Sequence, residues 1–197
     1  MDERDIVHIS KFLSLVLRHR PEVVGMKLEE GGWLRVDELI AGAKEAGVSL
    51  NREVLRVVVE HSDRKRFSFS EDGQKVRANY GHSIPIDLDL EPIEPPEFLF
   101  HGSAVQFIDA IRREGLVPQG RQYVHLSPDE QTAAEVGQRH GEAVVCTIQA
   151  RLMHESGFRF YRTVSGLWLT EHVPSEYIEF QSRYPASQGN PPKNPLD

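Results

Sequence analysis

Residues 66–78 read RFSFSEDGQKVRA, and this stretch decides the fold of the first part of the chain. Its first half alternates polar and aromatic side chains, which is typical of a strand with one buried face. A turn signal, Glu71-Asp72-Gly73, follows, and Lys75-Val76-Arg77-Ala78 alternates again. The stretch therefore predicts a β-hairpin.

Three helical patterns precede this hairpin. In the first, apolar residues recur every three or four positions until a proline ends the pattern. The second ends at a glycine, and the third begins after Asn51, a good N-cap residue. We expect these helices over residues 5–18, 37–46 and 52–61. Three helices followed by a hairpin predict a winged-helix lobe over residues 1–83.

Residues 84–97, IPIDLDLEPIEPPE, follow the hairpin and are rich in proline and acidic side chains. Proline lacks the backbone N–H that helices and sheets use, so this composition disfavours regular structure. We expect a linker that crosses the surface to a second domain over residues 98–182.

The second domain mixes strand and helix patterns, which predicts an α+β fold with a largely antiparallel sheet. Ser127 is expected as the N-cap of one helix, with Pro128 first and Glu130 third in that helix. Strands are expected over residues 98–101, 123–126, 143–150, 158–162, 167–170 and 177–181, and another helix over 104–114. Residues 183–197 are expected to form a disordered tail.

The charge of the chain restricts how it could bind nucleic acid. Its net charge is −7 and its pI about 5.7, whereas non-specific nucleic-acid binders are usually basic. An RNA substrate would therefore be recognised around one phosphate rather than along its backbone. The polar start, MDERDIVHIS, is unlike a signal peptide, and no apolar run approaches the ~20 residues that span a bilayer. We expect a cytoplasmic protein without membrane contact.

Common cofactor and metal patterns are absent from the sequence. It contains no G-x-G-x-x-G, no G-x-x-x-x-G-K-[ST], no H-E-x-x-H and no C-x-x-C. The one cysteine, Cys146, lies in an apolar run and is expected to be a buried, inert thiol. We expect no protein-bound catalytic metal.

Three basic segments are candidates for anion binding. They are Arg18-His19-Arg20 at a helix end, residues 63–67 before the hairpin, and Arg121 in a loop. Each has an ordinary explanation, because cations are favoured at helix C-termini and charged turns are commonly solvated. Arginine also offers a planar set of donors that matches a phosphate.

Two histidines, His101 and His125, each lie near the end of a short predicted strand. Either could be a hydrogen-bonded core residue, although two in one small sheet favour a site. Gly102 follows the first histidine, and a glycine there would let a ligand approach the backbone closely.

Taken together, these segments resemble the NAD⁺-dependent RNA 2′-phosphotransferases of tRNA splicing. The resemblance covers nearly the whole chain before the tail. Its segments are Ser10–His19, Gly32-Trp33, Val36–Leu39, Lys65–Phe67, Val76–Ser83, Leu99–Ser103, Val124–Ser127, Trp168–Thr170 and Val173-Pro174. Two residues depart from the family pattern: Tyr80 stands where glutamine is usual, and Ser103 where threonine is usual.

The resemblance implies a winged-helix lobe followed by an ADP-ribosyltransferase-like lobe, with NAD⁺ as co-substrate and no metal. It implies catalytic roles for Arg18, His19, Arg66 and Arg121. It implies NAD⁺ binding by His101, Gly102, Ser103, His125 and Ser127. RNA contacts are expected from Lys65, Arg77, Asn79 and His82.

The implied reaction has two steps. The RNA 2′-phosphate attacks C1″ of the nicotinamide ribose and expels nicotinamide, which gives an RNA 2′-phospho-ADP-ribose intermediate. The ribose 2″-hydroxyl then attacks phosphorus. The products are 2′-hydroxyl RNA and ADP-ribose 1″,2″-cyclic phosphate. We expect a monomer acting on tRNA-like RNA with an internal 2′-phosphate.

Two alternatives stay open at the level of sequence. One is ADP-ribosyl transfer on the same scaffold to a terminal nucleic-acid phosphate or to a protein. The other is a winged-helix nucleic-acid regulator that senses NAD⁺ without turning it over. This second alternative explains the first lobe but gives no reason for Arg121 or for the two strand-end histidines.

Overall fold

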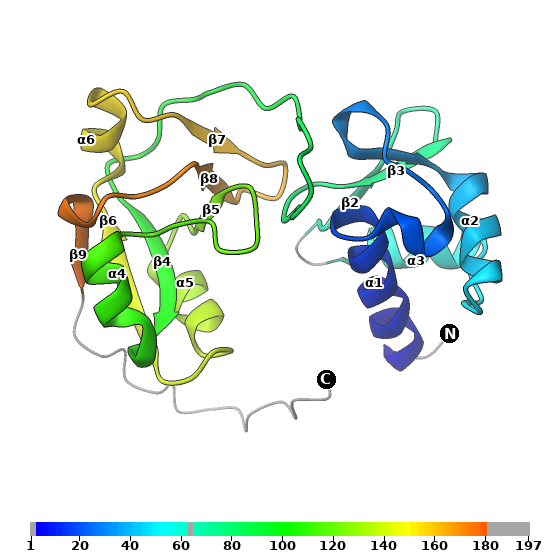
Figure 1. The fold of residues 1–197 in the computed structure, drawn as a ribbon, viewed down its shortest axis with the longest axis horizontal. Helices are drawn as coiled ribbons and strands as arrows, with labels where there is room; N and C mark the ends of the chain where they lie inside the picture. Colours follow the sequence, from blue (N-terminus) through cyan, green and yellow to red (C-terminus); the bar gives the residue numbers. More distant parts are fainter. Residues whose placement is uncertain (1–2, 63–64, 181–197) are drawn as a thin grey trace. The chain divides into compact units, whose positions relative to one another are not determined.

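The chain forms two compact units, Met1–Leu90 and Glu91–Asp197, each with its own hydrophobic core (Figure 1). The computed structural model describes residues 3–62 and 65–180. The expected tail at 183–197 lies outside the described residues, as do Asp63 and Arg64 of the second basic segment. No helix in the described ranges has the length and apolar character needed to cross a membrane.

Unit 1 packs helices against a small antiparallel sheet. Its elements are α1 (Glu3–Arg18), the 3₁₀ helices η1 (Pro21–Val24) and η2 (Glu30–Gly32), β1 (Trp33–Arg35), α2 (Val36–Glu45), α3 (Arg52–Glu60), β2 (Phe67–Phe69) and β3 (Lys75–Ala78). The strand order is β1-β3-β2, with Phe67 opposite Ala78 in the hairpin. The predicted helices and hairpin are confirmed.

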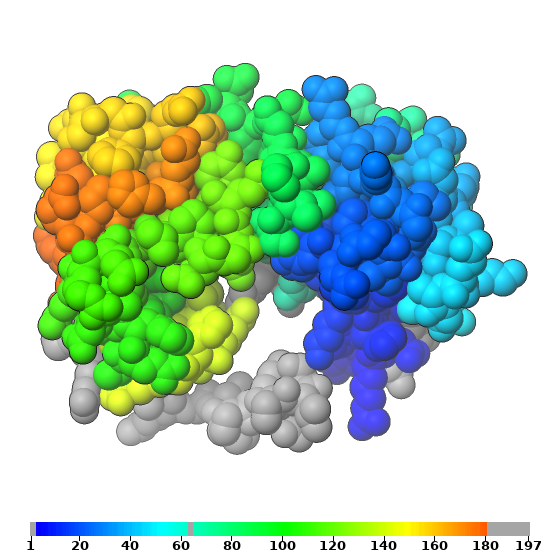
Figure 2. Space-filling model, in the orientation of Figure 1, coloured from blue at the N-terminus to red at the C-terminus, as the bar shows by residue number. Residues whose placement is uncertain are grey.

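Local sequence explains where these helices begin and end. Asn51 caps α3, because its side-chain oxygen accepts the Val54 N–H at 2.8 Å. Helix α1 ends at Arg18, three residues before Pro21. Its apolar stripe, which includes Leu13 and Leu17, is fully buried in the core of the unit. The opposite side of α1 lies at the surface, in dark blue in Figure 2.

Residues 84–97 have no regular secondary structure, as expected, but they are not a free linker. Leu88 is buried, and it lies with Ile86 beside Gly32 of unit 1. Further along, the Ile93 N–H donates to the Phe160 carbonyl at 2.9 Å, and Glu94 pairs with Arg151, both in unit 2. The segment is therefore attached by its first half to one unit and by its second half to the other.

Unit 2 has two small antiparallel sheets in its described residues, so the chain is an α+β protein. The first sheet has the order β4-β6-β9 and the second β5-β8-β7. The strands are β4 (Leu99–Ala104), β5 (Val124–Leu126), β6 (Ala143–Ile148), β7 (Phe160–Arg162), β8 (Trp168–Thr170) and β9 (Ile178–Phe180). The helices are η3 (Val105–Phe107), α4 (Ile108–Glu114), α5 (Glu130–Gly137), α6 (Ala150–Glu155) and η4 (Ser175–Tyr177).

The two sheets are joined through Phe100 and Ser127. Each residue donates its backbone N–H to the other's carbonyl, at 2.9 and 2.7 Å. This bridge corrects the expected helix start, because the Ser127 carbonyl, which an N-cap residue offers to the first helical N–H, accepts from Phe100 instead. The N-cap of α5 is Asp129 instead, whose carboxylate accepts the Thr132 N–H at 2.7 Å.

Two other expectations in unit 2 are adjusted. The predicted strand at 143–150 ends at Ile148, and a short helix that the sequence did not predict, α6, begins at Ala150.

Cys146 of strand β6 is confirmed as buried, and its burial raises the pKa of the thiol to about 11. The thiol is therefore protonated at neutral pH.

Helix α5 lies directly on β4, and glycine makes this contact possible. A Cβ on Gly102 would lie 1.7 Å from the Ala133 carbonyl oxygen, and one on Gly137 would lie 2.6 Å from the Ser103 oxygen. This packing does not test the expected contact of Gly102 with a ligand, which stays a prediction. The missing side chain leaves room for the backbone of α5.

Candidate functional site

The C-terminal end of α1 carries the first pair of candidate residues, Arg18 and His19. The last carbonyls of a helix lack partners within the helix. Here the Ser83 N–H donates to the Arg18 carbonyl at 3.0 Å. The Ser83 hydroxyl also lies 2.9 Å from Nδ1 of the exposed His19 ring. One residue, far along the sequence, therefore contacts both members of the pair.

The guanidinium of Arg18 lies close to two aromatic rings. Its Cζ is 5.0 Å from the centroid of Tyr80 and 5.7 Å from that of Phe67. Both distances are within the range of a cation–π interaction. Gly81, with φ of +86°, passes so close that a Cβ there would lie 3.4 Å from Arg18 Nη1. The Arg18 side chain is accordingly half-buried rather than extended into solvent.

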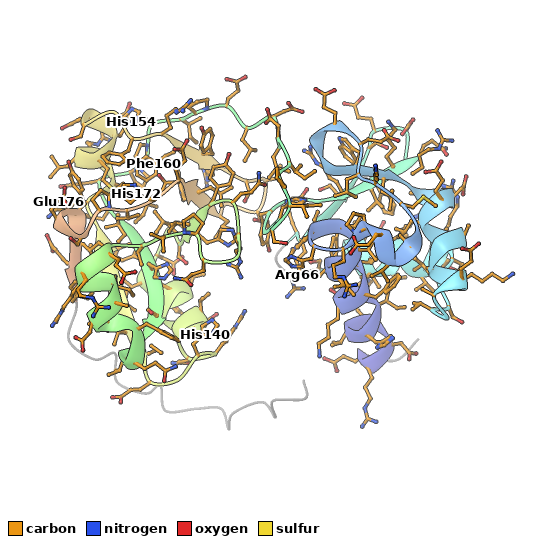
Figure 3. All side chains as sticks on the ribbon, in the orientation of Figure 1. Arg66, His140, His154, Phe160, His172 and Glu176 are labelled. Carbon is orange, nitrogen blue, oxygen red and sulfur yellow. The ribbon has the colours of Figure 1, made fainter. Side chains whose placement is uncertain are left out.

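Arg66 and Lys65 stand on the turn that enters β2, and Asn79 holds this turn in place. The Asn79 side-chain amide donates to the Lys65 carbonyl at 2.7 Å and to Ser68 Oγ at 2.8 Å. Its backbone N–H donates to the Arg66 carbonyl at 2.9 Å. Figure 3 labels Arg66 at this position. Asn79 is buried, so its observed role is to support two exposed or half-exposed cations.

Arg77 and His82, expected as RNA contacts, lie at least partly inside unit 1. Arg77 stacks on Trp33, with Cζ 4.5 Å from the ring centroid, and donates to the Gly31 carbonyl at 3.3 Å. Burial lowers the pKa of Arg77, and Asp89 acts against that shift.

His82 is only 2 % exposed. Its burial lowers the pKa of the imidazole to about 4, and the charges of Arg18, His19 and Arg77 add to the shift. The ring is therefore neutral at physiological pH. Of the expected RNA-binding residues, Lys65 alone is exposed, whereas Arg77 is half-buried and the other two are buried.

In unit 2, His101, His125 and Arg121 form a hydrogen-bonded series. His101 Nδ1 lies 3.1 Å from the His125 carbonyl oxygen, and Arg121 Nη1 lies 3.0 Å from His125 Nδ1. The structure thus brings together three residues that the sequence singled out separately.

The partners fix the tautomers of both histidines. A carbonyl oxygen can only accept, so His101 carries a proton on Nδ1; arginine can only donate, so His125 Nδ1 is unprotonated. Burial lowers the pKa of His101, and the nearby Arg121 and His140 lower it further, against the hydrogen bond to His125. His101 is therefore neutral, and its Nε2 is a hydrogen-bond acceptor.

The serines expected near NAD⁺ are both buried, at 6 % exposure. Ser103 stands two residues after His101 in β4, so the two side chains share the face of the strand opposite α5. Ser127 is fixed beside His125 by its backbone bridge to Phe100. Gly102 contributes no side chain and serves the packing of α5.

The two units therefore offer different chemistry. Unit 1 presents positive groups at the end of α1 and before β2, which suits an anion. Unit 2 presents a neutral imidazole acceptor and an arginine, which suit a ligand with hydroxyl groups and negative charge. Across residues 3–62 and 65–180, no group of side chains is arranged to hold a metal ion.

Sequence reasoning did not identify Phe67, Tyr80 and Ser83 as partners of the Arg18–His19 pair. Tyr80 was visible only as a departure from the family pattern. Ser83 lies 64 residues from His19, and no local pattern reports a contact at that separation.

Comparison with known proteins places these residues in a family context. The sequence profile of the family described as "RNA 2′-phosphotransferase, Tpt1 / KptA family" matches residues 4–172. A probable RNA 2′-phosphotransferase of Acaryochloris marina is 49% identical over 89% of this chain and 97% of its own length. The similarly named protein of Flavobacterium johnsoniae is 48% identical over 92% and 100%. That of Pectobacterium carotovorum is 53% identical over 87% and 92%.

Proposed function

Because this chain belongs to the RNA 2′-phosphotransferase family, we propose that it removes an internal 2′-phosphate from RNA by transferring it to NAD⁺. RNA carrying that phosphate, as a spliced tRNA does, is the substrate. Nicotinamide, 2′-hydroxyl RNA and ADP-ribose 1″,2″-cyclic phosphate are the products. Unit 1 is the winged-helix lobe of this enzyme and unit 2 the ADP-ribosyltransferase-like lobe.

The first step joins the RNA phosphate to the ribose of NAD⁺. A phosphate oxygen attacks C1″, the bond from C1″ to the nicotinamide nitrogen breaks, and neutral nicotinamide leaves with the bonding electrons. The phosphate is already anionic, so this step requires orientation rather than a general base. In unit 2, His101 Nε2 supports the ribose by accepting a hydrogen bond from a hydroxyl group, a role that its neutral form and tautomer permit.

The second step releases the RNA. The ribose 2″-hydroxyl attacks phosphorus and gives its proton to solvent. The bond from phosphorus to the RNA 2′-oxygen breaks, and that oxygen takes up a proton, so no net proton is gained or lost. Negative charge increases on the phosphoryl oxygens, and fixed positive donors stabilise it. Arg18, Arg66 and Arg121 supply these donors, and His19 protonates the leaving 2′-oxygen.

One observation carries the proposal beyond the family name. The series from Arg121 through His125 to His101 leaves a neutral imidazole acceptor beside an arginine in unit 2. A ligand that combines sugar hydroxyls with phosphates, as NAD⁺ does, matches this combination of groups.

The test is turnover of an oligoribonucleotide with one internal 2′-phosphate, with and without NAD⁺, with excess EDTA present in one arm. We expect 2′-hydroxyl product only with NAD⁺, at a rate that EDTA leaves unchanged. Arg18→Ala should abolish most of the activity, while Arg56→Ala, an exposed arginine of α3, is the matched control. Release of inorganic phosphate without NAD⁺ would contradict the proposal, and ADP-ribosylation of a terminal phosphate alone would favour the first alternative.

A further inference from the structure

We propose that Tyr80 and Ser83 are positioning residues for the Arg18–His19 pair. They belong to one short segment, Tyr80–Ser83, that returns from β3 to the end of α1. This inference rests on the proposed function, because it treats Arg18 and His19 as the groups that act on the RNA phosphate. Tyr80 fixes the guanidinium and Ser83 fixes the imidazole.

Ser83 makes two hydrogen bonds at the end of α1, one to the Arg18 backbone and one to the His19 ring. Its N–H donates to the Arg18 carbonyl at 3.0 Å, so the backbone of the segment is tied to the last turn of α1. Its hydroxyl, 2.9 Å from His19 Nδ1, sets the rotation of the ring. When His19 is protonated, Nδ1–H donates to Ser83 Oγ, and the second N–H, on Nε2, points away from Ser83. Ser83 thereby selects the nitrogen that faces the reacting phosphate.

Tyr80 acts on Arg18 through its aromatic face. The guanidinium carbon lies 5.0 Å from the Tyr80 centroid and 5.7 Å from the Phe67 centroid, so the group contacts two aromatic rings. A long side chain held in this way has lost part of its rotational freedom before a ligand arrives, which reduces the entropic cost of binding.

The segment is itself well anchored between these two contacts. Gly81 adopts φ of +86°, a conformation that favours glycine, and approaches Arg18 closely. The ring of His82 is buried, with Nε2 3.4 Å from where a Cβ on Gly32 would stand. Because the His82 ring is buried in the core, the segment can hold Tyr80 and Ser83 at set positions against α1.

At each of the two positions, one variant removes the contact and a second variant keeps it. Ser83→Ala removes the hydroxyl and Ser83→Thr keeps it; Tyr80→Leu removes the ring, and Tyr80→Phe keeps it. We expect Ser83→Ala to lower the rate of RNA release on the order of 10-fold, the effect of one hydrogen bond to a charged group, with Ser83→Thr close to wild type. Tyr80→Leu should raise KM for 2′-phosphorylated RNA by about 2- to 5-fold, with Tyr80→Phe unchanged.

NMR of the full chain gives readouts that do not depend on activity. In wild type, ring currents should move the Arg18 Hε signal upfield, and Tyr80→Leu should move it back while Tyr80→Phe does not. The ¹⁵N shift of His19 Nδ1 and the pH at which it titrates should change in Ser83→Ala and be restored in Ser83→Thr. If the wild type is inactive on RNA, the proposed function fails while these shifts still decide the positions of both rings.

Three results would overturn the inference. One is an Arg18 Hε signal that is the same in wild type and Tyr80→Leu. Another is a His19 Nδ1 signal that Ser83→Ala does not change. The third is equal loss of activity in the conservative and the disruptive variant at either position, since a merely structural role would not distinguish them.

Discussion

Mild acid should destabilise unit 1 through His82. The ring is 2 % exposed, and its burial, with the charges of three neighbouring cationic residues, lowers its pKa from 6.5 to about 4. In the unfolded chain the same ring takes up a proton near pH 6.5. The unfolded state therefore binds more protons between these two pKa values, so stability is complete above about pH 6.5 and is lost as the pH falls through about 4.

The magnitude follows from the size of the shift. A difference of one pKa unit corresponds to 1.36 kcal/mol, so a shift from 6.5 to about 4 amounts to about 3 kcal/mol when the loss is complete. At about pH 4.5 most of this loss has occurred, roughly 2 to 3 kcal/mol relative to pH 7.5. That is a large fraction of the 5–15 kcal/mol by which domains are usually stable.

Urea unfolding at pH 7.5 and 4.5 measures this effect. The chain has two tryptophans, Trp33 in unit 1 and Trp168 in unit 2, so a Trp168→Phe background makes fluorescence report on unit 1 alone. In that background, the free energy of unfolding of His82→Gln should fall by about 2 to 3 kcal/mol less than that of the parent between the two pH values. His8→Gln, at an exposed position on α1, is the control for replacing a histidine. Equal losses in the parent and His82→Gln would refute the argument.

Three other predictions test the packing and the reaction. Gly102→Ala should lower the free energy of unfolding by about 3 kcal/mol in thermal melts, because its Cβ would lie 1.7 Å from a main-chain oxygen of α5. Gly120→Ala, where a Cβ meets nothing within 4 Å, should change little, and equal melting temperatures for the two would contradict this account. Asp129→Ala should cost about 1 kcal/mol through loss of the N-cap of α5, measured by chemical unfolding, and no loss would mean that the cap adds nothing. In time courses with 2′-phosphorylated RNA, His19→Ala should accumulate the RNA 2′-phospho-ADP-ribose intermediate. His101→Ala should instead slow formation of this intermediate, without accumulation. The opposite pattern would reverse the roles of His19 and His101.

The sequence by itself determined the elements whose causes lie within a few residues. Helix α3 begins where Asn51 can accept an N–H three residues on, and α1 stops shortly before Pro21. The β2–β3 hairpin follows from alternation on both sides of a glycine turn. The ordered series of short segments also determined the family, because each segment can be recognised without knowledge of its spatial neighbours.

Only the tertiary structure decided the relations between distant residues. Ser127 carries a good cap signal, yet its backbone pairs with Phe100, so the helix begins at Asp129. Gly102 packs against the backbone of α5, a contact that the sequence did not predict.

The same holds for the candidate site. The tautomer of His101 depends on a carbonyl 24 residues away, and the orientation of His19 on a hydroxyl 64 residues away. Such contacts arise from packing of whole elements, and hydrogen bonding and burial act through space, so the local order of residues does not encode them.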